Sequence, residues 1–412
     1  MDFIIPYTEE QQRFRQEVRS WIEHNVPAEM RVPIDRAKDL TEEHETWWKE
    51  KRKELAKKGW LYPTFPKQYG GGGLTADYAT VLEEEFTNAR INLGFFSNSW
   101  ALDALLVWGT EEQKQRFLVP LLKGEKTTWY KYTEPQSGGD LAGIQTRAVK
   151  DGDDWLITGQ NVFISGFRGA TRPDYVFGPA ITDADAPRHR NMGVFIIPVN
   201  SPGFEVRAQN LLVGDEQHFL FLDNVRVPGS HLIGGEHQGW QVAMTAAENE
   251  HGGQGRPAPT DPEAENLVAF ARQTRINGGA LGQDPVLQQI AMDAQLESHI
   301  SSILLRRTNW MYHRRMEVQH EGSMANVFGR EYSLRNATRI REVMGLYSLL
   351  GTRDPRAPLG GAQEVAQRSR AGQNHGGGST NINKVILARR IGISRTRERA
   401  AVTPATSGAL GS

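Results

Sequence analysis

The segment Tyr130-Lys-Tyr-Thr-Glu-Pro-Gln-Ser-Gly-Gly-Asp140 stands where the pattern of the sequence changes from helical to extended. Before it, apolar residues recur at the three- and four-residue spacing of amphipathic helices. After it, as far as Gly234, apolar and polar residues alternate between Gly and Pro, which is typical of an antiparallel barrel or sandwich. Helical spacing returns after Gly239. We therefore predict an α+β protein with an N-terminal helical domain (1–126), a middle β-domain (127–234), a C-terminal helical bundle (235–395) and a disordered tail (396–412).

Local signals support this division. A Thr followed three residues later by a Gln is a capping box, and it occurs at Thr8/Gln11 and at Thr110/Gln113. Each pair is therefore expected to begin a helix. Between two alternating runs of the middle part, Asp151-Gly152 predicts a β-hairpin.

The C-terminal part is expected to contain several long helices. The longest covers Pro285–Met316, and one of its faces is apolar. Residues 351–378 are rich in Gly, Pro, Arg and Gln and indicate a long loop before a last helix near Thr380. The residues expected to be buried on the apolar face of the longest helix are Ile290, Met292, Leu296, Ile300, Ile303 and Leu304.

Composition excludes several classes of protein. The 412 residues are enough for two or three domains, and 48 Lys and Arg balance 49 Asp and Glu, which gives no electrostatic reason for a nucleic-acid partner. The absence of cysteine excludes disulfides, thiolate metal sites and a Cys nucleophile. The first ten residues lack the basic and apolar regions of a signal peptide, and no apolar run approaches the roughly 18–20 residues that a bilayer requires. We expect a soluble, cytoplasmic protein.

A series of motifs resembles the acyl-CoA dehydrogenase family from Gln11 to about Arg395. Tyr130–Asp140 is the most specific and resembles the flavin-loop signature T-E-P-x-x-G-S-D, and Gly159–Ser165 resembles G-x-K-x-W-I-T. The resemblance implies the family's three-domain fold and an FAD enzyme that removes two hydrogens from the α and β carbons of an acyl-CoA. The other motifs are Gly59-Trp60, Pro66–Leu74, Gly109–Lys114 and Phe221–Pro228.

The flavin contacts implied by this resemblance fit the chemistry of the ring. An isoalloxazine needs flat apolar contact on one face and hydrogen-bond donors along its polar edge. Gly139 departs from the usual Ser of the signature. Taken alone, the loop pattern favours an edge loop with a β-bulge, and the family context reverses that preference in favour of a flavin loop. The resemblance implies FAD contacts from Tyr130, Tyr132, Thr133, Gly138, Gly139, Phe163, Ser165, Arg275 and Ser379.

The catalytic base follows from a second comparison with the family pattern. Many members carry the base Glu just before the final helix, but Gly377 occupies that position here. Another class carries it on the first helix of the C-terminal bundle, where Glu250 aligns with the base and His251 replaces the usual Arg. Glu248 and Glu250 are about 200° apart on a helix, so only one can face the flavin. The alternative is that both are solvated carboxylates. The backbone N–H of Gly377 is implied to donate to the thioester carbonyl.

The function implied by the resemblance is α,β-dehydrogenation of an acyl-CoA thioester, with base Glu250 and with flavin N5 accepting the β-hydride. The expected partners are an acceptor such as an electron-transfer flavoprotein and like or unlike subunits in a dimer or tetramer. Two alternatives stay open: a flavin monooxygenase on the same fold, and the supporting subunit of a heteromeric dehydrogenase. The Gly-Gly pair before the last helix resembles bacterial enzymes that act on steroid side chains and other bulky acyl groups.

Overall fold

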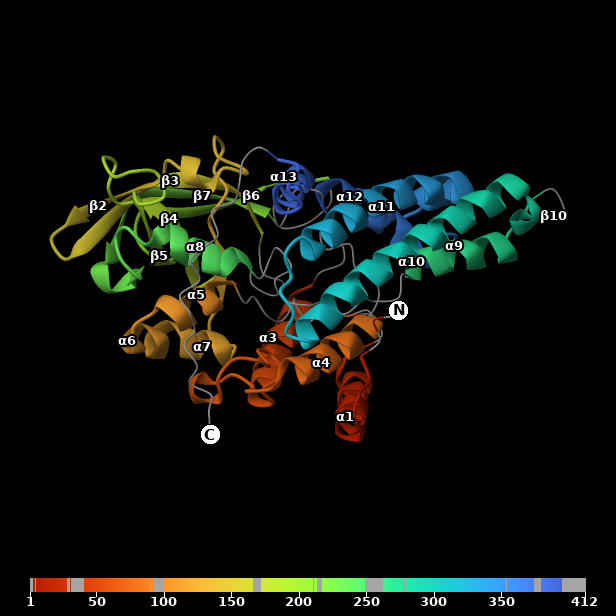
Figure 1. The fold of residues 1–412 in the computed structure, drawn as a ribbon, viewed down its shortest axis with the longest axis horizontal. Coiled ribbons are helices and arrows are strands. Elements are labelled where there is room, and N and C mark those ends of the chain that lie inside the picture. The colour runs from red at the N-terminus through yellow and green to blue at the C-terminus, as the bar shows by residue number, and fades with distance from the viewer. Residues whose placement is uncertain are drawn as a thin grey trace.

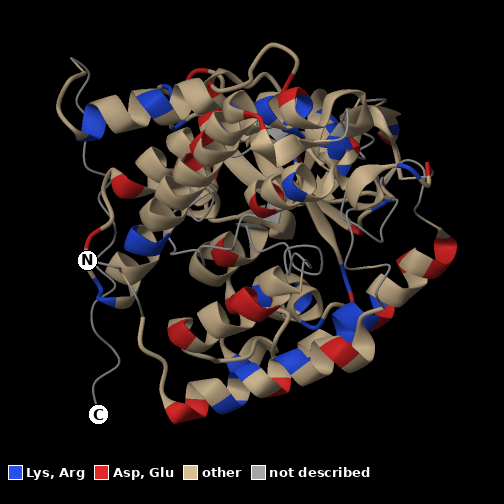
Figure 2. Ribbon diagram, turned by 90° about the vertical axis from the view of Figure 1, so that its right-hand side faces the viewer, with Lys and Arg blue, Asp and Glu red and all other residues tan. Residues whose placement is uncertain are grey.

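The structure is a computed structural model that describes residues 3, 5–27, 30, 41–89, 91, 100–165, 172–209, 211–212, 217–248, 262–276, 279–352, 354–373 and 379–394. The β-sheet lies at one end of the molecule and the long C-terminal helices extend to the other (Figure 1). N-terminal helices lie along one side of both. Acidic and basic residues are interspersed along the ribbon (Figure 2), as their nearly equal numbers suggest.

The N-terminal part is helical, as predicted. The capping boxes at Thr8 and Thr110 are both present, and each pairs its Thr with the Gln three residues on. Val18, Leu82 and Phe86 are fully buried in the core that these helices share. The elements are α1 (Glu9–Asn25), α3 (Glu42–Lys57), η2 (Lys67–Tyr69), α4 (Ala76–Asn88), α5 (Trp100–Trp108), α6 (Glu111–Gln113), the π-helical segment η4 (Lys114–Leu118) and α7 (Val119–Leu122).

The middle part is one eight-stranded sheet in the order β6-β7-β3-β2-β4-β5-β8, with β1 paired to β4. The predicted hairpin is confirmed, because Asp151 pairs with Asp154 around Gly152, whose φ is +64°. The strands are β1 (Thr128–Tyr130), β2 (Arg147–Asp151), β3 (Asp154–Ser165), β4 (Tyr175–Ile181), β5 (Met192–Pro198), β6 (Phe204–Gln209), β7 (Gln217–Pro228) and β8 (Leu232–Ile233), with turns η5 (Leu141–Gly143) and η6 (Gly229–His231).

Most strands of the middle β-domain pair antiparallel, as predicted, but two pairings are parallel. β1 pairs with β4 in parallel over Thr128–Tyr130, and Arg147 of β2 pairs with Ile181 of β4 in parallel. The reason is the chain path, since β1 leaves the helical domain and enters the sheet beside a strand that comes much later in the sequence. Residue alternation fixes which face a side chain occupies but leaves the neighbouring strand open.

The C-terminal part is helical, and residues 351–378 differ from the prediction. The predicted long loop contains α12 (Ala362–Gln373) after the turn η9 (Pro358–Gly361). Its Ala, Gln, Glu and Arg residues are strong helix formers, and Glu364 pairs with Arg368 one turn later. The other elements are α8 (Gly239–Glu248), α9 (Pro262–Gln273), β9 (Arg275–Ile276), β10 (Gly279–Ala280), η7 (Leu281–Gln283), α10 (Pro285–His313), α11 (Glu321–Met344), η8 (Gly345–Leu349) and α13 (Thr380–Arg390).

The apolar face of α10 is not buried within the single chain, contrary to prediction. Met292 is 63% exposed and Leu296 is 60% exposed, whereas Ala294 between them is buried. The four other apolar residues expected on that face are only half-buried. The helix was correctly predicted, but a large part of its apolar surface is left uncovered by the described part of this chain.

None of the described helices is long and apolar enough to cross a bilayer. The described residues also contain no group of three His, Asp or Glu side chains that could hold a metal ion. The predicted tail at 396–412 lies outside the described residues.

Candidate flavin site

The Tyr130–Asp140 segment leaves the end of β1 and is fixed by the buried carboxylate of Glu134. This side chain is 2% exposed and accepts hydrogen bonds from the backbone N–H groups of Gln145 (2.6 Å) and Thr146 (3.0 Å). It also accepts from the Thr146 hydroxyl at 2.5 Å and from the Gln136 amide at 2.6 Å. The Glu of the motif therefore ties the loop to the start of β2 and is fully engaged in doing so.

The loop is also joined to β3 through Thr133. The Thr133 carbonyl accepts from the backbone N–H of Val162 at 3.0 Å and from the side-chain amide of Asn161 at 3.1 Å. Within the described part of the chain, the Thr133 hydroxyl makes no hydrogen bond. The carbonyl is thus fixed by the protein, while the hydroxyl remains available to a ligand.

Phe163 follows directly in β3 and has an unusual backbone. The pairing of β3 with β7 shifts register between Asn161 and Ile164, which marks a β-bulge, and Phe163 has a φ of +58°. A left-handed backbone is strained for an aromatic residue, and such strain is common at functional sites. The bulge leaves the Phe163 ring 54% exposed, with no ring contact among the described residues. The β-bulge therefore leaves this aromatic ring open at the surface of β3.

Ser165 is the last residue of β3 and is exposed. Its hydroxyl has no hydrogen-bond partner in the described ranges. Phe163 and Ser165 are two residues apart in an extended segment, and the bulge between Asn161 and Ile164 ends before Ser165. An exposed aromatic ring and two unengaged hydroxyls therefore occur on the joined segments of Thr133 and β3.

Tyr130 and Tyr132 are held by helices. Their ring centroids are 6.0 Å apart, and the Tyr130 hydroxyl accepts from the backbone N–H of Ala101 at 2.9 Å. Burial raises the pKa of Tyr130 well above its ordinary value. The Tyr132 hydroxyl donates to the Ala243 carbonyl of α8 over 3.5 Å, which is a long and weak bond. These rings therefore fasten the start of the loop to α5 and α8.

The two glycines of the loop differ in their surroundings. At Gly138, a Cβ would meet nothing within 4 Å among the described atoms, so this backbone is open to a ligand. At Gly139, a Cβ would lie 3.2 Å from the Ile382 side chain of α13. Ser379 caps that helix, since its hydroxyl accepts from the Ile382 N–H at 3.2 Å. The fold thus brings α13 against the Tyr130–Asp140 loop.

Within the single chain, Arg275 lies apart from the other predicted flavin contacts. It lies exposed on β9, in a two-stranded hairpin with β10. Figure 1 shows β10 at the opposite end of the molecule from β3. The two predicted catalytic residues, Glu250 and Gly377, lie outside the described residues, as does His251. The backbone of α8 is described as far as Glu248.

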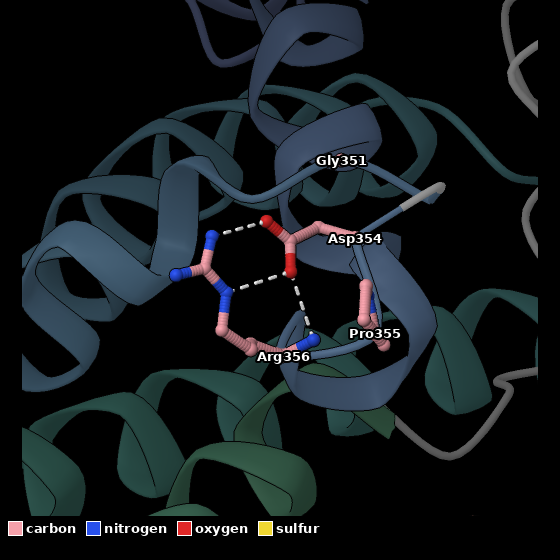
Figure 3. Close-up of a pocket in the computed structure, with 4 residues that line it drawn as sticks. All are labelled: Gly351, Asp354, Pro355 and Arg356. Atoms are coloured by element: carbon pink, nitrogen blue, oxygen red, sulfur yellow. Dashed lines mark hydrogen bonds and ion pairs between the residues drawn. The ribbon is translucent and has the colours of Figure 1, made fainter.

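A hollow lined by Gly351, Asp354, Pro355 and Arg356 lies elsewhere, in the segment after η8 (Figure 3). The Asp354 carboxylate accepts from the Arg356 side chain at 2.7 and 3.0 Å and from its backbone N–H at 2.9 Å. These bonds lower the pKa of Asp354 to about 2. Among the described residues, none of the predicted flavin contacts lines this hollow, and its one carboxylate is already engaged.

The described residues fit a flavin. The exposed ring of Phe163 supplies flat apolar surface, and the hydroxyls of Thr133 and Ser165 can bond the polar edge of an isoalloxazine. The open backbone at Gly138 allows close approach. Sequence reasoning found these positions through the motif. It missed the anchoring role of Glu134 and the buried Lys131 beside it, although a Lys within an apolar strand was a visible signal.

Family models match the chain along most of its length. They describe the N-terminal, middle and C-terminal domains of acyl-CoA dehydrogenases and match residues 8–125, 130–225 and 237–392. The chain therefore belongs to the acyl-CoA dehydrogenase family and is an oxidoreductase with that family's three-domain fold. The members of this family are flavoproteins.

The most similar curated proteins include other acyl-CoA dehydrogenases. The chain is 27% identical to acyl-CoA dehydrogenase FadE26 of Mycobacterium tuberculosis over 393 residues, which cover 93% of this chain and 96% of the relative. It is 30% identical to acyl-CoA dehydrogenase IpdE1 of Mycolicibacterium smegmatis over 300 residues, covering 68% and 74%.

Solved structures of similar fold include the Tcur3481-Tcur3483 steroid ACAD. Its TM-score is 0.81 at 26% identity, covering 97% of this chain and 100% of that one. The ChsE4-ChsE5 complex from Mycobacterium tuberculosis gives a TM-score of 0.80 at 26% identity, covering 95% and 100%.

Proposed function

We propose that this protein catalyses the FAD-dependent α,β-dehydrogenation of an acyl-CoA thioester to the 2-enoyl-CoA. The observation that carries the proposal is the arrangement of Thr133, Phe163 and Ser165 around the anchored loop. Two unengaged hydroxyls and an exposed aromatic ring on joined segments offer the contacts that an isoalloxazine requires. Membership of the family supplies the reaction class.

The cofactor is proposed to bind through the residues of the anchored loop, β3 and α13. Thr133, Ser165 and the open backbone at Gly138 face the polar part of the ring, and Phe163 offers flat apolar surface. FAD, when bound, supplies the acceptor for the β-hydrogen as a hydride at N5. Gly139 and Ser379 bring α13 to the same place. Arg275 lies on β9, which pairs with β10 at the end of the molecule opposite β3, and is proposed to serve the adenine-nucleotide part of an FAD on a neighbouring subunit.

The proton is proposed to leave the α-carbon to Glu250. A thioester α-proton is only weakly acidic, so the base must lie close to it and the carbonyl oxygen must receive hydrogen bonds. We propose the backbone N–H of Gly377 as one such donor, which needs no side chain. A desolvated carboxylate has a raised pKa, which brings its basicity nearer to the operating pH.

The acyl group is proposed to be bulky, with a ring-bearing or steroid-derived chain. Two similar structures at 26% identity are described as a steroid ACAD and as the ChsE4-ChsE5 complex. The Gly-Gly pair at 377–378, where many members have Glu-Gly, supports the same subclass. We propose an electron-transfer flavoprotein as the class of electron acceptor.

We expect the purified protein to be yellow and to release FAD, not FMN, on denaturation. The cofactor is identified by chromatography of the released flavin. Anaerobic addition of a suitable acyl-CoA should then bleach the flavin band. A flavin monooxygenase behaves differently, since it requires reduced flavin and oxygen and gives no bleaching by acyl-CoA alone. Colourless protein that takes up no added FAD would contradict the proposed activity for the isolated chain and would favour a supporting subunit.

We expect an assembly of two or four subunits in which the apolar face of α10 is covered. Met292 and Leu296 expose more than half of their surface, and contiguous apolar surface of this kind commonly marks an interface. Replacing both residues by Lys should reduce the assembly size measured by light scattering at micromolar concentration. Val149→Lys is the control, because Val149 is a similarly exposed apolar residue on β2. A monomeric wild-type protein that retains FAD would argue against this assembly.

A further inference from the structure

Helix α8 lies between the N-terminal helices and the β-sheet, although it belongs to the C-terminal part of the sequence (Figure 1). It packs against α5 on one side and against β4 and β5 on the other. Its contact surface is made of small side chains, since Ala243 and Ala246 are fully buried and Ala247 is 7% exposed. Apolar contact is not directional, so a face of alanines brings the helix close to its neighbours but does little to fix its rotation.

A directional contact joins α8 to α5. The Trp108 indole N–H, at the end of α5, donates to the Thr245 hydroxyl of α8 at 2.9 Å. The same hydroxyl donates its single proton to the Gln241 carbonyl at 3.0 Å. The hydroxyl therefore has to accept from the indole, which can only donate. Among the described side chains of α8, Thr245 alone forms a hydrogen bond to another element.

The rotation of α8 decides which of its positions face the flavin loop. Ala243 is buried, and its carbonyl accepts the weak bond from Tyr132 of that loop, whereas Gln241 is exposed. Residues two turns apart lie on nearly the same face of a helix. In that register, position 248 falls on the exposed face of Gln241, and a continuation of the helix to position 250 would fall on the buried face of Ala243. A turn of α8 about its axis would remove this distinction.

We propose that Trp108 is a positioning residue for the dehydrogenation, whose hydrogen bond to Thr245 fixes the rotation of α8 and thereby the direction of the base that follows this helix. The inference rests on the proposed function, in which Glu250 removes the α-proton. Trp108 need not touch substrate or flavin, because it acts through α8. Proton transfer requires the base within close reach of the α-carbon, so a small turn of α8 is expected to slow it.

The test measures the rate of anaerobic flavin bleaching at saturating FAD, the Kd for FAD and the urea midpoint. The probe is the acyl-CoA that bleaches the wild-type flavin fastest among straight-chain and steroid-derived thioesters. Trp108→Phe keeps an aromatic ring and removes the N–H, and Thr245→Val keeps the shape and removes the hydroxyl. Each should lower the bleaching rate about tenfold, less than the roughly 10²-fold that a displacement of 1 Å can cost, and leave the Kd for FAD at its wild-type value.

Two further variants separate the hydrogen bond from packing. Thr245→Ser keeps the acceptor and should bleach at nearly the wild-type rate. The double variant Trp108→Phe with Thr245→Val should bleach no more slowly than the slower single variant, because the bond is already absent once either partner is replaced.

Matched controls make the same chemical changes elsewhere. Trp21→Phe is the control for the indole, because Trp21 donates to the Glu54 carboxylate at 2.7 Å between α1 and α3, within the N-terminal domain. Thr46→Val is the control for the hydroxyl, because Thr46 donates to the Glu42 carbonyl of its own helix at 2.9 Å, as Thr245 does in α8. Both controls should bleach at the wild-type rate, whatever they do to the urea midpoint.

The outcomes separate this inference from the proposed function. A wild-type bleaching rate in Trp108→Phe or in Thr245→Val overturns the inference. A double variant whose loss is the product of the two single losses also overturns it, because the two side chains then act independently. Wild-type protein whose flavin no acyl-CoA bleaches contradicts the proposed function. The urea midpoints then decide the structural part: losses of stability that do not add support the bond between α5 and α8, and additive losses overturn it.

Discussion

Glu250→Gln should slow the bleaching of the flavin by an acyl-CoA at least about 10²-fold, while FAD content and ligand binding stay at wild-type levels. The amide preserves the size of the side chain but removes its basicity. Gly377, at the position where many family members carry the base, has no side chain that could substitute for it. The measurement is rapid anaerobic mixing with acyl-CoA, followed at the flavin absorption band.

Glu248→Gln provides the matched control for this experiment. The two carboxylates are two positions apart, so a continuous helix would turn them about 200° from each other. Only one of them can therefore face the flavin, and we expect Glu248→Gln to reduce its flavin at nearly the wild-type rate. A wild-type rate in Glu250→Gln would show the assignment to be wrong. Glu248 or a residue of the 351–378 segment would then become the candidate base.

The parts of the fold that the sequence predicted well are those decided by neighbours along the chain. The capping boxes at Thr8 and Thr110 and the hairpin around Gly152 depend on contacts within four residues, and all three are present. The Tyr130–Asp140 segment was located by a specific motif, because close backbone approach and anchored hydrogen bonds restrict the residue types that such a loop can use.

The parts that the sequence did not predict depend on distant residues. The parallel pairing of β1 with β4 joins residues 47 positions apart, such as Thr128 and Tyr175, and alternation alone does not select a strand's neighbour. The exposed face of α10 looks like core in the sequence because an apolar stripe has the same pattern whether it meets its own chain or another. Gly178 of β4 lies so close to the backbone of Lys131 that a Cβ would be 2.4 Å from the Lys131 carbonyl oxygen, and that contact is visible only in three dimensions.

The glycine-rich segment Pro66–Leu74 illustrates a motif whose role is packing. Its backbone turns back against the end of α3, where the Gly72 N–H donates to the Tyr62 carbonyl at 3.0 Å. A Cβ at Gly72 would lie only 2.0 Å from the Gly59 carbonyl oxygen and 2.8 Å from that of Pro63. Both contacts are to backbone atoms, which cannot move aside as a flexible side chain can. The glycines that Gly59-Trp60 and Pro66–Leu74 share with the family pattern are thus explained by the close approach of the two backbones.

Gly72→Ala should therefore destabilise the N-terminal domain by about 3 kcal/mol or more, at the upper end of what overpacking costs. The measurement is the midpoint of urea unfolding, followed by tryptophan fluorescence, to which the buried Trp60 in the same core contributes. Gly329→Ala is the matched control, since a Cβ there meets only the Ser301 hydroxyl, at an ordinary 3.5 Å. Because Gly329 lies inside α11, alanine should raise helix propensity and stabilise the protein by up to about 1 kcal/mol. The same Gly→Ala substitution is thus expected to lower the stability at one position and raise it at the other. An unchanged midpoint in Gly72→Ala would mean that the contact between Gly59 and Gly72 can open without cost, and the steric account of the motif would be wrong.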